Sequence, residues 1–453
     1  MPRSVFMAGA AKEEITPVKG TLIGGDFVSF YARFIHDPLY AKSLVLKNGE
    51  KCFTIIMLDL CIVPSDLMEE IKCLVNDSIG IAKEDILLAC THTHGAPDVA
   101  GILGGAVDIS YRKKLPSLVL KSVKKANEKC RPAKIASGKT MVSGHHMCRR
   151  YIMDEKYVAH NPVRKNPDTI KTNPFGANKQ ILRPNSEVDN EIGFIMIKGL
   201  DGKWISSIAN FASHYAGDWG VDTITADFYG VFANEMRSNL SATDDFIGML
   251  SYGTGGNVNT WDFSKSDQIL KTDFKRANLI GKTIANSIFD SVKGLVWEEN
   301  PTLDIKYKEL KIPIQKPSNA EIVKAESILE KNRINGIKLD AHGMSVLYAR
   351  EQLLLNEYPE FHLASVQMMK IGSQLIGASG AELFTETGLW LKRNLKKDNY
   401  FTICLANTYD GYVVPSHEMK KGGYETWRAR SSFLKDGSEN DIKMAMLELS
   451  KDL

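Results

Sequence analysis

Residues 40–63 read YAKSLVLKNGEKCFTIIMLDLCIV, with an apolar stretch on either side of Asn48-Gly49. An Asn-Gly pair between such stretches predicts a β-hairpin, because both residues tolerate the positive φ angles of a tight turn. The second stretch is apolar on both faces, which is typical of a strand buried within a layered fold. It ends at Asp59, so the hairpin is expected to place a carboxylate at the end of a buried strand.

The segments that follow extend this pattern into a strand–helix–strand succession. Residues 65–80, SDLMEEIKCLVNDSIG, have a helical spacing of apolar residues after a Ser-Asp start, and residues 85–95, DILLACTHTHG, begin as a buried strand. This order predicts an α/β fold of layered sheets flanked by helices. Because functional groups gather at the carboxyl ends of strands in such folds, we expect a metal site there.

The rest of the chain repeats these signals without a detectable tandem repeat or a low-complexity linker. Further hairpins are predicted at Asp201-Gly202 and Ile371-Gly372, and further helices are predicted near 111–128, 225–240, 274–293, 317–334, 341–357 and 440–451. We therefore expect one large domain over residues 1–453. Residues 140–190 are rich in Pro, Asn and Lys and are expected to form long loops, a lid or pocket wall inserted within that domain.

Composition excludes several classes of function. The chain has 453 residues and a formal net charge of +3, with no basic block that could neutralise nucleic-acid phosphates. No apolar run reaches the roughly 18 residues that cross a bilayer, and the N-terminal sequence has no signal-peptide core. A cytoplasmic protein without a transmembrane segment, acting on a small molecule rather than on nucleic acid, is expected.

Three histidines are the strongest candidates for chemistry. His92 and His94 are one residue apart, a spacing that would put both side chains on one face of a strand. The pair could bind one metal ion, or one could bind metal while the other contacts substrate; two hydrogen-bonded core histidines are the alternative. His214 ends another predicted strand. A catalytic zinc site needs about three protein ligands and an open position.

Residue patterns alone do not rank the carboxylates that could complete such a site. A second metal ion near Asp59 and Asp98 also remains an open alternative. The candidates at strand ends or helix starts are Asp59, Asp98, Asp227 and Glu382. Residues 253–259, GTGGNVN, lack the order of a phosphate-binding loop and are expected to form a tight turn that lets the backbone approach a site. An arginine of the Arg149-Arg150 pair could bind a substrate carboxylate or an oxyanion.

Taken together, several motifs resemble the neutral/alkaline (non-lysosomal) ceramidase family. The motifs, in the order expected of that family, are AGAAKEEITP, HDPLYAKSLVL, THTHGAP, NFASH, GGNVN, GAELF and ANTYDGYV. The resemblance covers about residues 8–430 and implies the family's N-terminal catalytic domain. That family is a group of zinc-dependent amidases that cleave the N-acyl bond of ceramide to sphingosine and a fatty acid.

The resemblance implies a set of site residues. The implied zinc ligands are His92, His214, Glu382 and Tyr412. Carried over in the same way, His94 would face the substrate, and Arg149 would contact the substrate or the oxyanion. Tyr409 is a second candidate for the oxyanion contact.

The sequence also departs from the family. Asn259 stands where the family has a serine implicated in catalysis, Gly95-Ala96 replaces Ser-Gly, and the sequence stops before an immunoglobulin-like domain. We expect a zinc-dependent amidohydrolase acting on a small N-acyl substrate, either ceramide or a small polar compound such as an amino-sugar or peptide derivative. The alternatives are a non-catalytic carbohydrate- or lipid-binding relative and a metalloenzyme of another class, such as an esterase, phosphoesterase or isomerase.

Overall fold

The three predicted hairpins belong to three copies of one folding unit. The computed structural model describes residues 5–265, 273–334 and 336–453. Each unit is an antiparallel hairpin, a helix, and a strand that pairs in parallel with the second hairpin strand. The elements of the three units are β5 (Tyr40–Asn48), β6 (Lys51–Leu58), α1 (Ser65–Ile79) and β7 (Ile86–Cys90); β13 (Glu191–Gly199), β14 (Trp204–Phe211), α3 (Asp227–Asn239) and β16 (Ile247–Tyr252); and β19 (Phe361–Ile371), β20 (Gln374–Ser379), α7 (Thr385–Leu395) and β22 (Asn399–Ile403).

Each hairpin turns at the glycine that the sequence indicates. Gly49, Gly202 and Gly372 have φ angles of 61°, 85° and 58°. This left-handed region is strained for residues with a Cβ atom, so glycine lets each pair of strands reverse within a few residues. The units share this local chemistry and the same topology, although no tandem repeat is visible in the sequence.

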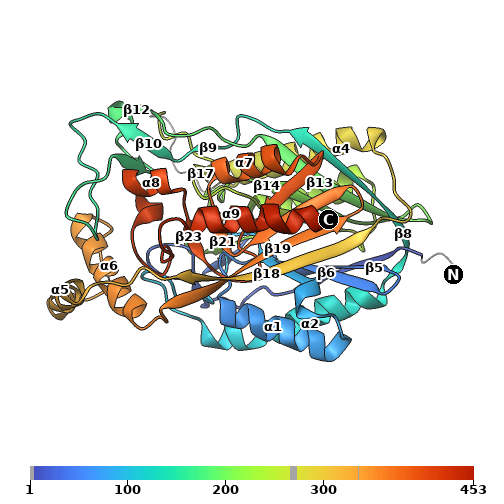
Figure 1. The fold of residues 1–453 in the computed structure, drawn as a ribbon, viewed down its shortest axis with the longest axis horizontal. Coiled ribbons are helices and arrows are strands. Elements are labelled where there is room, and N and C mark those ends of the chain that lie inside the picture. The colour runs from blue at the N-terminus through green and yellow to red at the C-terminus, as the bar shows by residue number, and fades with distance from the viewer. Residues whose placement is uncertain (1–4, 266–272, 335) are drawn as a thin grey trace.

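Two sheets pack face to face to form the centre of the molecule (Figure 1). The first two units join through β1 (Met7–Glu14) and β8 (Arg131–Met141) into an eight-stranded sheet with the order β16-β14-β13-β8-β1-β5-β6-β7. The third unit forms the four-stranded sheet β18-β19-β20-β22 with β18 (Leu303–Pro313). Strand residues alternate between the two faces, so apolar residues of both sheets meet between them.

Helices cover the outer faces of both sheets. With α1 and α3, α2 (Ile109–Glu128) and α4 (Lys275–Ser291) pack on the larger sheet, while α7 and α9 (Ser438–Leu449) pack on the smaller one. In Figure 1, α9 lies in front of β18 and β19, and α1 and α2 lie along the lower edge. The predicted α/β architecture of layered sheets flanked by helices is confirmed.

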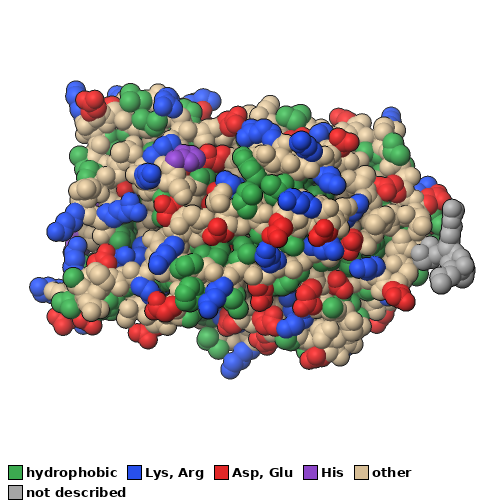
Figure 2. Space-filling model, in the orientation of Figure 1, with side chains coloured by type: hydrophobic (Ala, Val, Ile, Leu, Met, Phe, Trp, Pro, Cys, Tyr) green, Lys and Arg blue, Asp and Glu red, His purple; other side chains and the backbone are tan. Residues whose placement is uncertain are grey.

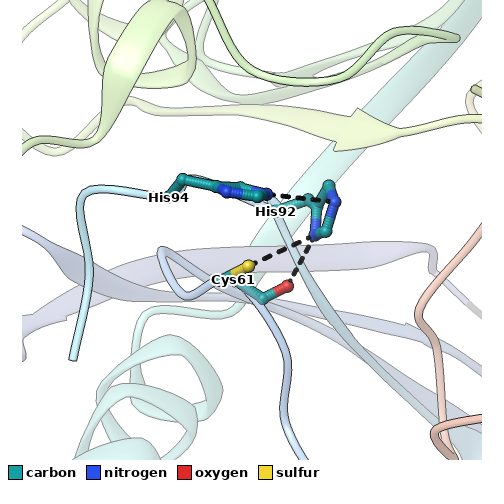
Figure 3. A group of neighbouring side chains, drawn as sticks. All are labelled: Cys61, His92 and His94. Carbon is teal, nitrogen blue, oxygen red and sulfur yellow. Dashed lines mark hydrogen bonds between the residues drawn. The ribbon is translucent and has the colours of Figure 1, made fainter. Parts of the chain in front are cut away.

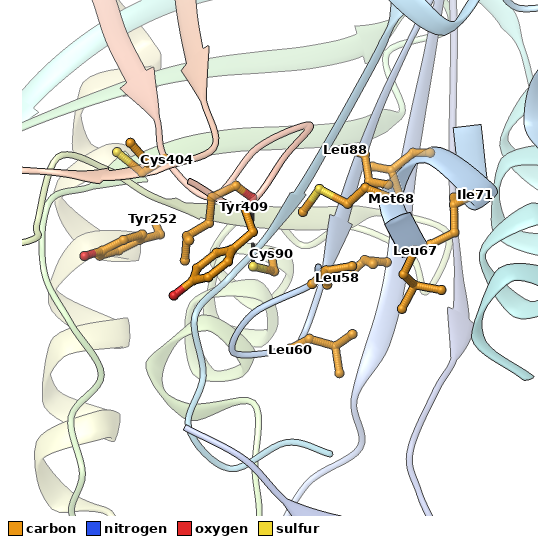
Figure 4. Close-up of a cluster of buried hydrophobic side chains, with 14 of the residues drawn as sticks. Leu58, Leu60, Leu67, Met68, Ile71, Leu88, Cys90, Tyr252, Cys404 and Tyr409 are labelled. Carbon is orange, nitrogen blue, oxygen red and sulfur yellow. Dashed lines mark hydrogen bonds between the residues drawn. The ribbon is translucent and has the colours of Figure 1, made fainter. Parts of the chain in front are cut away.

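Helix α1 illustrates why these helices form where they do. Its buried residues include Leu67, Met68 and Ile71, which recur at helical spacing and leave most of the polar residues on the other face. Figure 4 places these three side chains near Leu58, the last residue of β6, and Leu88, two residues before the end of β7. The helix therefore holds the ends of two parallel strands in register.

The remaining elements in the described part of the chain are small sheets, three further helices and 3-10 turns. The small sheets comprise β10 (Arg150–Met153), β11 (Ile170–Thr172) and β12 (Ile181–Pro184), and the pairs β9 (Met147–Cys148) with β17 (Val258–Asn259), β2 (Leu22–Ile23) with β3 (Phe30–Tyr31), β4 (Phe34–Ile35) with β15 (Thr223–Ile224), and β21 (Ala381–Leu383) with β23 (Gly411–Val413). The other helices are α5 (Asn319–Glu330), α6 (Ala341–Asn356) and α8 (Ser416–Lys421), with 3-10 turns at Lys83–Asp85, Asn178–Gln180, Val292–Gly294, Tyr424–Thr426 and Ser450–Asp452.

Residues 140–190 contain strands as well as loops. The sequence led us to expect long loops only, but the segment includes β9 and the three-stranded sheet β10–β12. Several of its residues line a large cavity that is described below. Its function as a lid stays a prediction.

The surface carries charges of both signs. On the face shown in Figure 2, basic and acidic side chains are interspersed over most of the surface. Among the helices of the described residues, none is both long enough and apolar enough to cross a membrane.

Candidate metal centre

The carboxyl ends of the unit strands bring the candidate residues together. His92 follows β7, and His214 follows β14. Glu382 follows β20 within the short strand β21, and Tyr412 follows β22 within β23, where it pairs directly with Glu382. All three units therefore contribute to one site, as expected for a layered fold with functional groups at strand ends.

The ligand atoms of this cluster are spaced as metal ligands are. Glu382 Oε2 lies 3.5 Å from His92 Nε2 and 3.4 Å from His214 Nε2. The Tyr412 hydroxyl lies 3.1 Å from His214 Nε2. Ligand atoms about 2.0–2.1 Å from a tetrahedral zinc ion are roughly 3.3–3.4 Å from one another. The separations agree with that geometry to within about 0.3 Å.

Backbone carbonyls orient the imidazole rings of His92 and His214 so that their Nε2 atoms face the cluster. His92 Nδ1 lies 2.9 Å from the Cys61 carbonyl oxygen, and His214 Nδ1 lies 2.9 Å from the carbonyl oxygens of Gly255 and Val258. Burial lowers the pKa of both histidines, which favours neutral rings with Nδ1 donating and Nε2 free to bind a metal.

The glycine-rich stretch 253–259 lets the backbone carbonyls come close to His214. An added Cβ at Gly255 would lie 2.7 Å from the Ser213 amide nitrogen, and one at Gly256 would lie 2.6 Å from the Glu382 carbonyl oxygen. Side chains there would push the loop away from His214. The stretch is thus a close-packed turn beside the site, as its sequence predicts, and not a phosphate-binding loop.

The Glu382 carboxylate is the best indicator that a cation belongs in the cluster. Its Oε2 atom is buried and has no hydrogen-bond partner. It faces two imidazole nitrogens whose own protons, in this tautomer, point the other way. A buried carboxylate oxygen in such surroundings costs free energy unless a cation compensates it. The residues therefore fit a divalent metal ion, and their N and O atoms suit zinc.

The other candidate carboxylates have different partners. Asp59 forms an ion pair with Lys42 Nζ at 2.8 Å. Asp98 accepts hydrogen bonds from two backbone N–H groups of the turn that follows it. Asp227 likewise accepts from two backbone N–H groups. Of the four carboxylates, Glu382 is the one that faces the histidines.

The strand geometry predicted for the histidines is wrong, although their proximity is right. β7 ends at Cys90, and His92 has a φ angle of 70°, so His92 and His94 do not share the face of a strand. Similarly, β14 ends three residues before His214. The chain turns sharply at His92, and His94 Nε2 still lies 3.4 Å from His92 Nε2 (Figure 3).

The other predicted site residues also lie around this cluster. Arg149 donates from Nε to Glu425 at 2.8 Å and from Nη2 to the Gly256 carbonyl oxygen at 2.7 Å, and its guanidinium lies 5.4 Å from the Tyr412 ring centroid. The Tyr409 hydroxyl is buried without a partner. Asn259, in β17, uses its Oδ1 to accept a hydrogen bond from the Thr260 amide.

Two adjacent spaces, which share several lining residues, lie beside the cluster. A small recess of about 50 Å³, here called the inner chamber, is lined by His92, His94, Glu382, Tyr409 and Tyr412, among others. A larger space of about 560 Å³, here called the outer cavity, is lined by both polar and aromatic residues. His94 and Tyr412 line both spaces, so the candidate metal centre lies at the floor of the outer cavity.

Comparisons with known proteins support this fold. A crystal structure of neutral ceramidase from Pseudomonas aeruginosa matches with a TM-score of 0.74 and 14% identity, over 99% of this chain and 74% of that one. A ceramidase structure described as complexed with C2 matches with a TM-score of 0.72 and 15% identity, over 99% and 75%. No protein-family model and no curated protein sequence matches the chain.

The chain has the neutral ceramidase fold. Within this fold, sequence reasoning missed residues that hold or surround the site. Glu425 is fully buried and binds Arg149, Arg150 and the Thr172 hydroxyl. Tyr215 stacks on His94 with ring centroids 3.7 Å apart. Tyr215 directly follows His214 and was detectable as its neighbour, whereas Glu425 lies far along the chain and carries no motif.

Proposed function

We propose that this protein is a zinc-dependent hydrolase that cleaves the C–N bond of an N-acyl compound. The observation that carries the proposal is the unpartnered Glu382 oxygen, which faces His92 and His214 at the floor of a cavity. The ceramidase structures that share the fold support the choice of an amide as the bond that is cleaved.

Four residues would hold the zinc ion in this proposal. They are His92, His214, Glu382 and Tyr412. Bound there, zinc would polarise the substrate carbonyl and lower the pKa of water. The two hydrogen bonds from Nδ1 to backbone carbonyls keep the histidine rings oriented for this purpose.

His94 is placed to move the proton. It lines both the inner chamber and the outer cavity, and its ring is fixed by stacking on Tyr215. A neutral imidazole in that position would accept a proton from the attacking water and return it to the departing amine nitrogen. This transfer turns a poor leaving group into a neutral amine.

Three further residues would stabilise the tetrahedral transition state or orient the substrate. Arg149 lines the outer cavity and carries a positive charge beside Tyr412, where the carbonyl oxygen becomes negative. The Tyr409 hydroxyl, buried and unpartnered in the inner chamber, is available to donate to the same oxygen. Asn259 lines the outer cavity and offers its amide group to the substrate. Glu425 positions Arg149 through its Nε hydrogen bond.

The substrate would be a small amide that fits the outer cavity. Its volume of about 560 Å³ and its mixture of aromatic and polar lining suit an amphiphilic N-acyl compound. Ceramide and smaller polar N-acyl compounds are both substrates to test.

Metal analysis and substrate screening test the proposal together. Elemental mass spectrometry of protein purified without added zinc or a histidine tag should find about one zinc per chain. N-acyl amides should be hydrolysed faster than matched esters and phosphates. His92→Ala should lose both the metal and turnover, whereas His146→Ala is the matched control, because that buried histidine bonds to the Asp189 carbonyl oxygen outside the site. Full metal content and activity in His92→Ala would refute the proposed site.

A further inference from the structure

Asp26 stands at the junction of the two spaces and has no part in the chemistry proposed above. It lines both the inner chamber and the outer cavity. The preceding residue, Gly25, has a φ angle of 99°, and a Cβ there would lie 2.9 Å from His94 Nδ1 and 3.0 Å from Cys61 Sγ. The backbone before Asp26 thus packs against His94 and Cys61, and Asp26 itself lines the spaces on either side of His94.

No cation among the described residues forms an ion pair with this carboxylate. Asp26 Oδ1 accepts a hydrogen bond of 2.7 Å from the Phe27 amide. Within residues 5–265, 273–334 and 336–453, Asp26 forms no ion pair with a lysine, arginine or histidine. Its negative charge therefore faces the junction without compensation.

Two cations that line the outer cavity, Arg149 and Lys171, already lie close to carboxylates other than Asp26. Arg149 forms an ion pair with Glu425 at 2.8 Å. Lys171 is attracted by Asp168 and Glu425. The carboxylate of Asp26 is consequently available to pair with a positively charged ligand.

Aromatic rings surround the same space. Tyr215 lies near enough that, after burial, the Asp26 charge is the largest influence raising its pKa. The aromatic residues lining the outer cavity include Phe27, Phe30, Tyr215, Trp219, Trp261 and Tyr424. Aromatic faces attract organic cations, most strongly where water is excluded. A carboxylate together with such faces is the chemistry that recognises an ammonium group.

We infer that the junction binds an ammonium group, so that the preferred substrates are N-acyl compounds carrying a cationic nitrogen near the scissile amide. The inference deepens the proposed function, on which its catalytic part rests, and makes Asp26 the specificity-determining residue. A compound with a hydroxyl or methyl group in place of the ammonium would leave the carboxylate desolvated and unpaired.

Binding to the metal-free protein tests the inference without turnover. Trp219, Trp261 and Trp427 line the outer cavity, so intrinsic fluorescence reports its occupation. We expect choline to bind about tenfold more tightly than 3,3-dimethylbutan-1-ol, its neutral isostere. Asp26→Asn should abolish that preference. Asp222→Asn is the control, because Asp222 pairs with Arg33 and does not line either space.

The outcomes separate this inference from the hydrolase proposal. Equal binding of the two probes, undetectable choline binding, or a preference that survives Asp26→Asn would each overturn the ammonium site, whether or not the protein is an enzyme. If the protein hydrolyses amides, Asp26→Asn should lower kcat/KM about tenfold for an N-acyl ammonium compound and should not lower it for the hydroxyl analogue, which no longer leaves a carboxylate unpaired. Absence of metal and turnover would instead refute the hydrolase proposal and leave the binding result intact.

Discussion

The floor of the site and the wall of the outer cavity are built in different ways. The floor comes from the strand ends of three copies of one unit, and its histidines are fixed by backbone carbonyls. The wall comes mostly from long connections, and three of its apolar side chains, Phe175, Val221 and Leu339, are exposed. Rigid strand ends suit the placing of reacting groups, while connections can vary without disturbing the sheets. Floor substitutions should therefore change kcat, and wall substitutions should change KM.

The largest effect is expected from Glu382→Gln on the floor. The amide removes the negative charge that lies beside both histidines, so the metal should bind more weakly and kcat should fall at least about 10³-fold. Steady-state kinetics and metal content measured on the same sample check this. Glu386→Gln is the control, because that carboxylate pairs with His417 away from both spaces. A Glu382→Gln enzyme with native kcat would show that the floor is not where the chemistry occurs.

The neighbouring arginines sharpen the comparison where the wall meets the floor. They belong to residues 140–190, but the Arg149 guanidinium lies 5.4 Å from the ring centroid of Tyr412 on the floor. Both are buried and both bind Glu425, but Arg149 lines the outer cavity and Arg150 does not. Arg149→Lys cannot keep both its hydrogen bonds, so kcat should fall about 10²-fold with a small change in Tm. Arg150→Lys loses contacts to Glu418 and Glu425, so Tm should fall while kcat is preserved. The same kcat loss in both variants would mean that Arg149 acts only by supporting the fold.

Much of the floor could be predicted from the sequence because its signals are local. The glycine of each hairpin turn and the periods of α1 and α3 are readable over a few residues, so the three hairpins and these two helices were predicted, whereas α7 of the third unit was not. The choice of Glu382 among four carboxylates was not readable. It depends on the folded structure, in which Asp59 pairs with Lys42 while Asp98 and Asp227 accept hydrogen bonds from backbone N–H groups. In the same structure Glu382 is brought to histidines that lie far away in the chain. The choice of Glu382 came instead from the resemblance to the ceramidase family.

The wall could be predicted only in outline. Composition indicated that residues 140–190 form a pocket wall, but not that they contain a small sheet. Asp26 and Glu425 carry no motif, and their roles arise from contacts across the fold. The geometry of His92 shows the same limit, because a left-handed φ at a non-glycine residue is imposed by the surrounding structure and not by local preference.

Phe175→Ala should separate the wall from the floor by its effect on KM. Phe175 lines the outer cavity, is 64% exposed and touches Phe263 edge-on. Losing its apolar surface should raise KM about fivefold for an N-acyl substrate, with kcat and Tm nearly unchanged. Phe361→Ala is the matched control, since Phe361 is exposed at the start of β19 and lines neither space. A fall in kcat at unchanged KM would contradict the expectation that wall residues affect KM and floor residues affect kcat.

The smallest effect is expected far from the cavity, in the helix of the first unit. Lys72 is buried in α1, and burial lowers its pKa from 10.5 to about 8. Between these values the unfolded chain binds a proton that the folded chain does not, so the free energy of unfolding should rise as the pH goes from 8 to 10.5. Lys72→Met should remove this slope and raise the free energy of unfolding at pH 7 by about 1 kcal/mol. Urea unfolding at several pH values checks it, with Lys114→Met on the exposed side of α2 as control. A wild-type profile without the slope would mean that the Lys72 ammonium group reaches water. The burial of Lys72 would then not lower the free energy of unfolding.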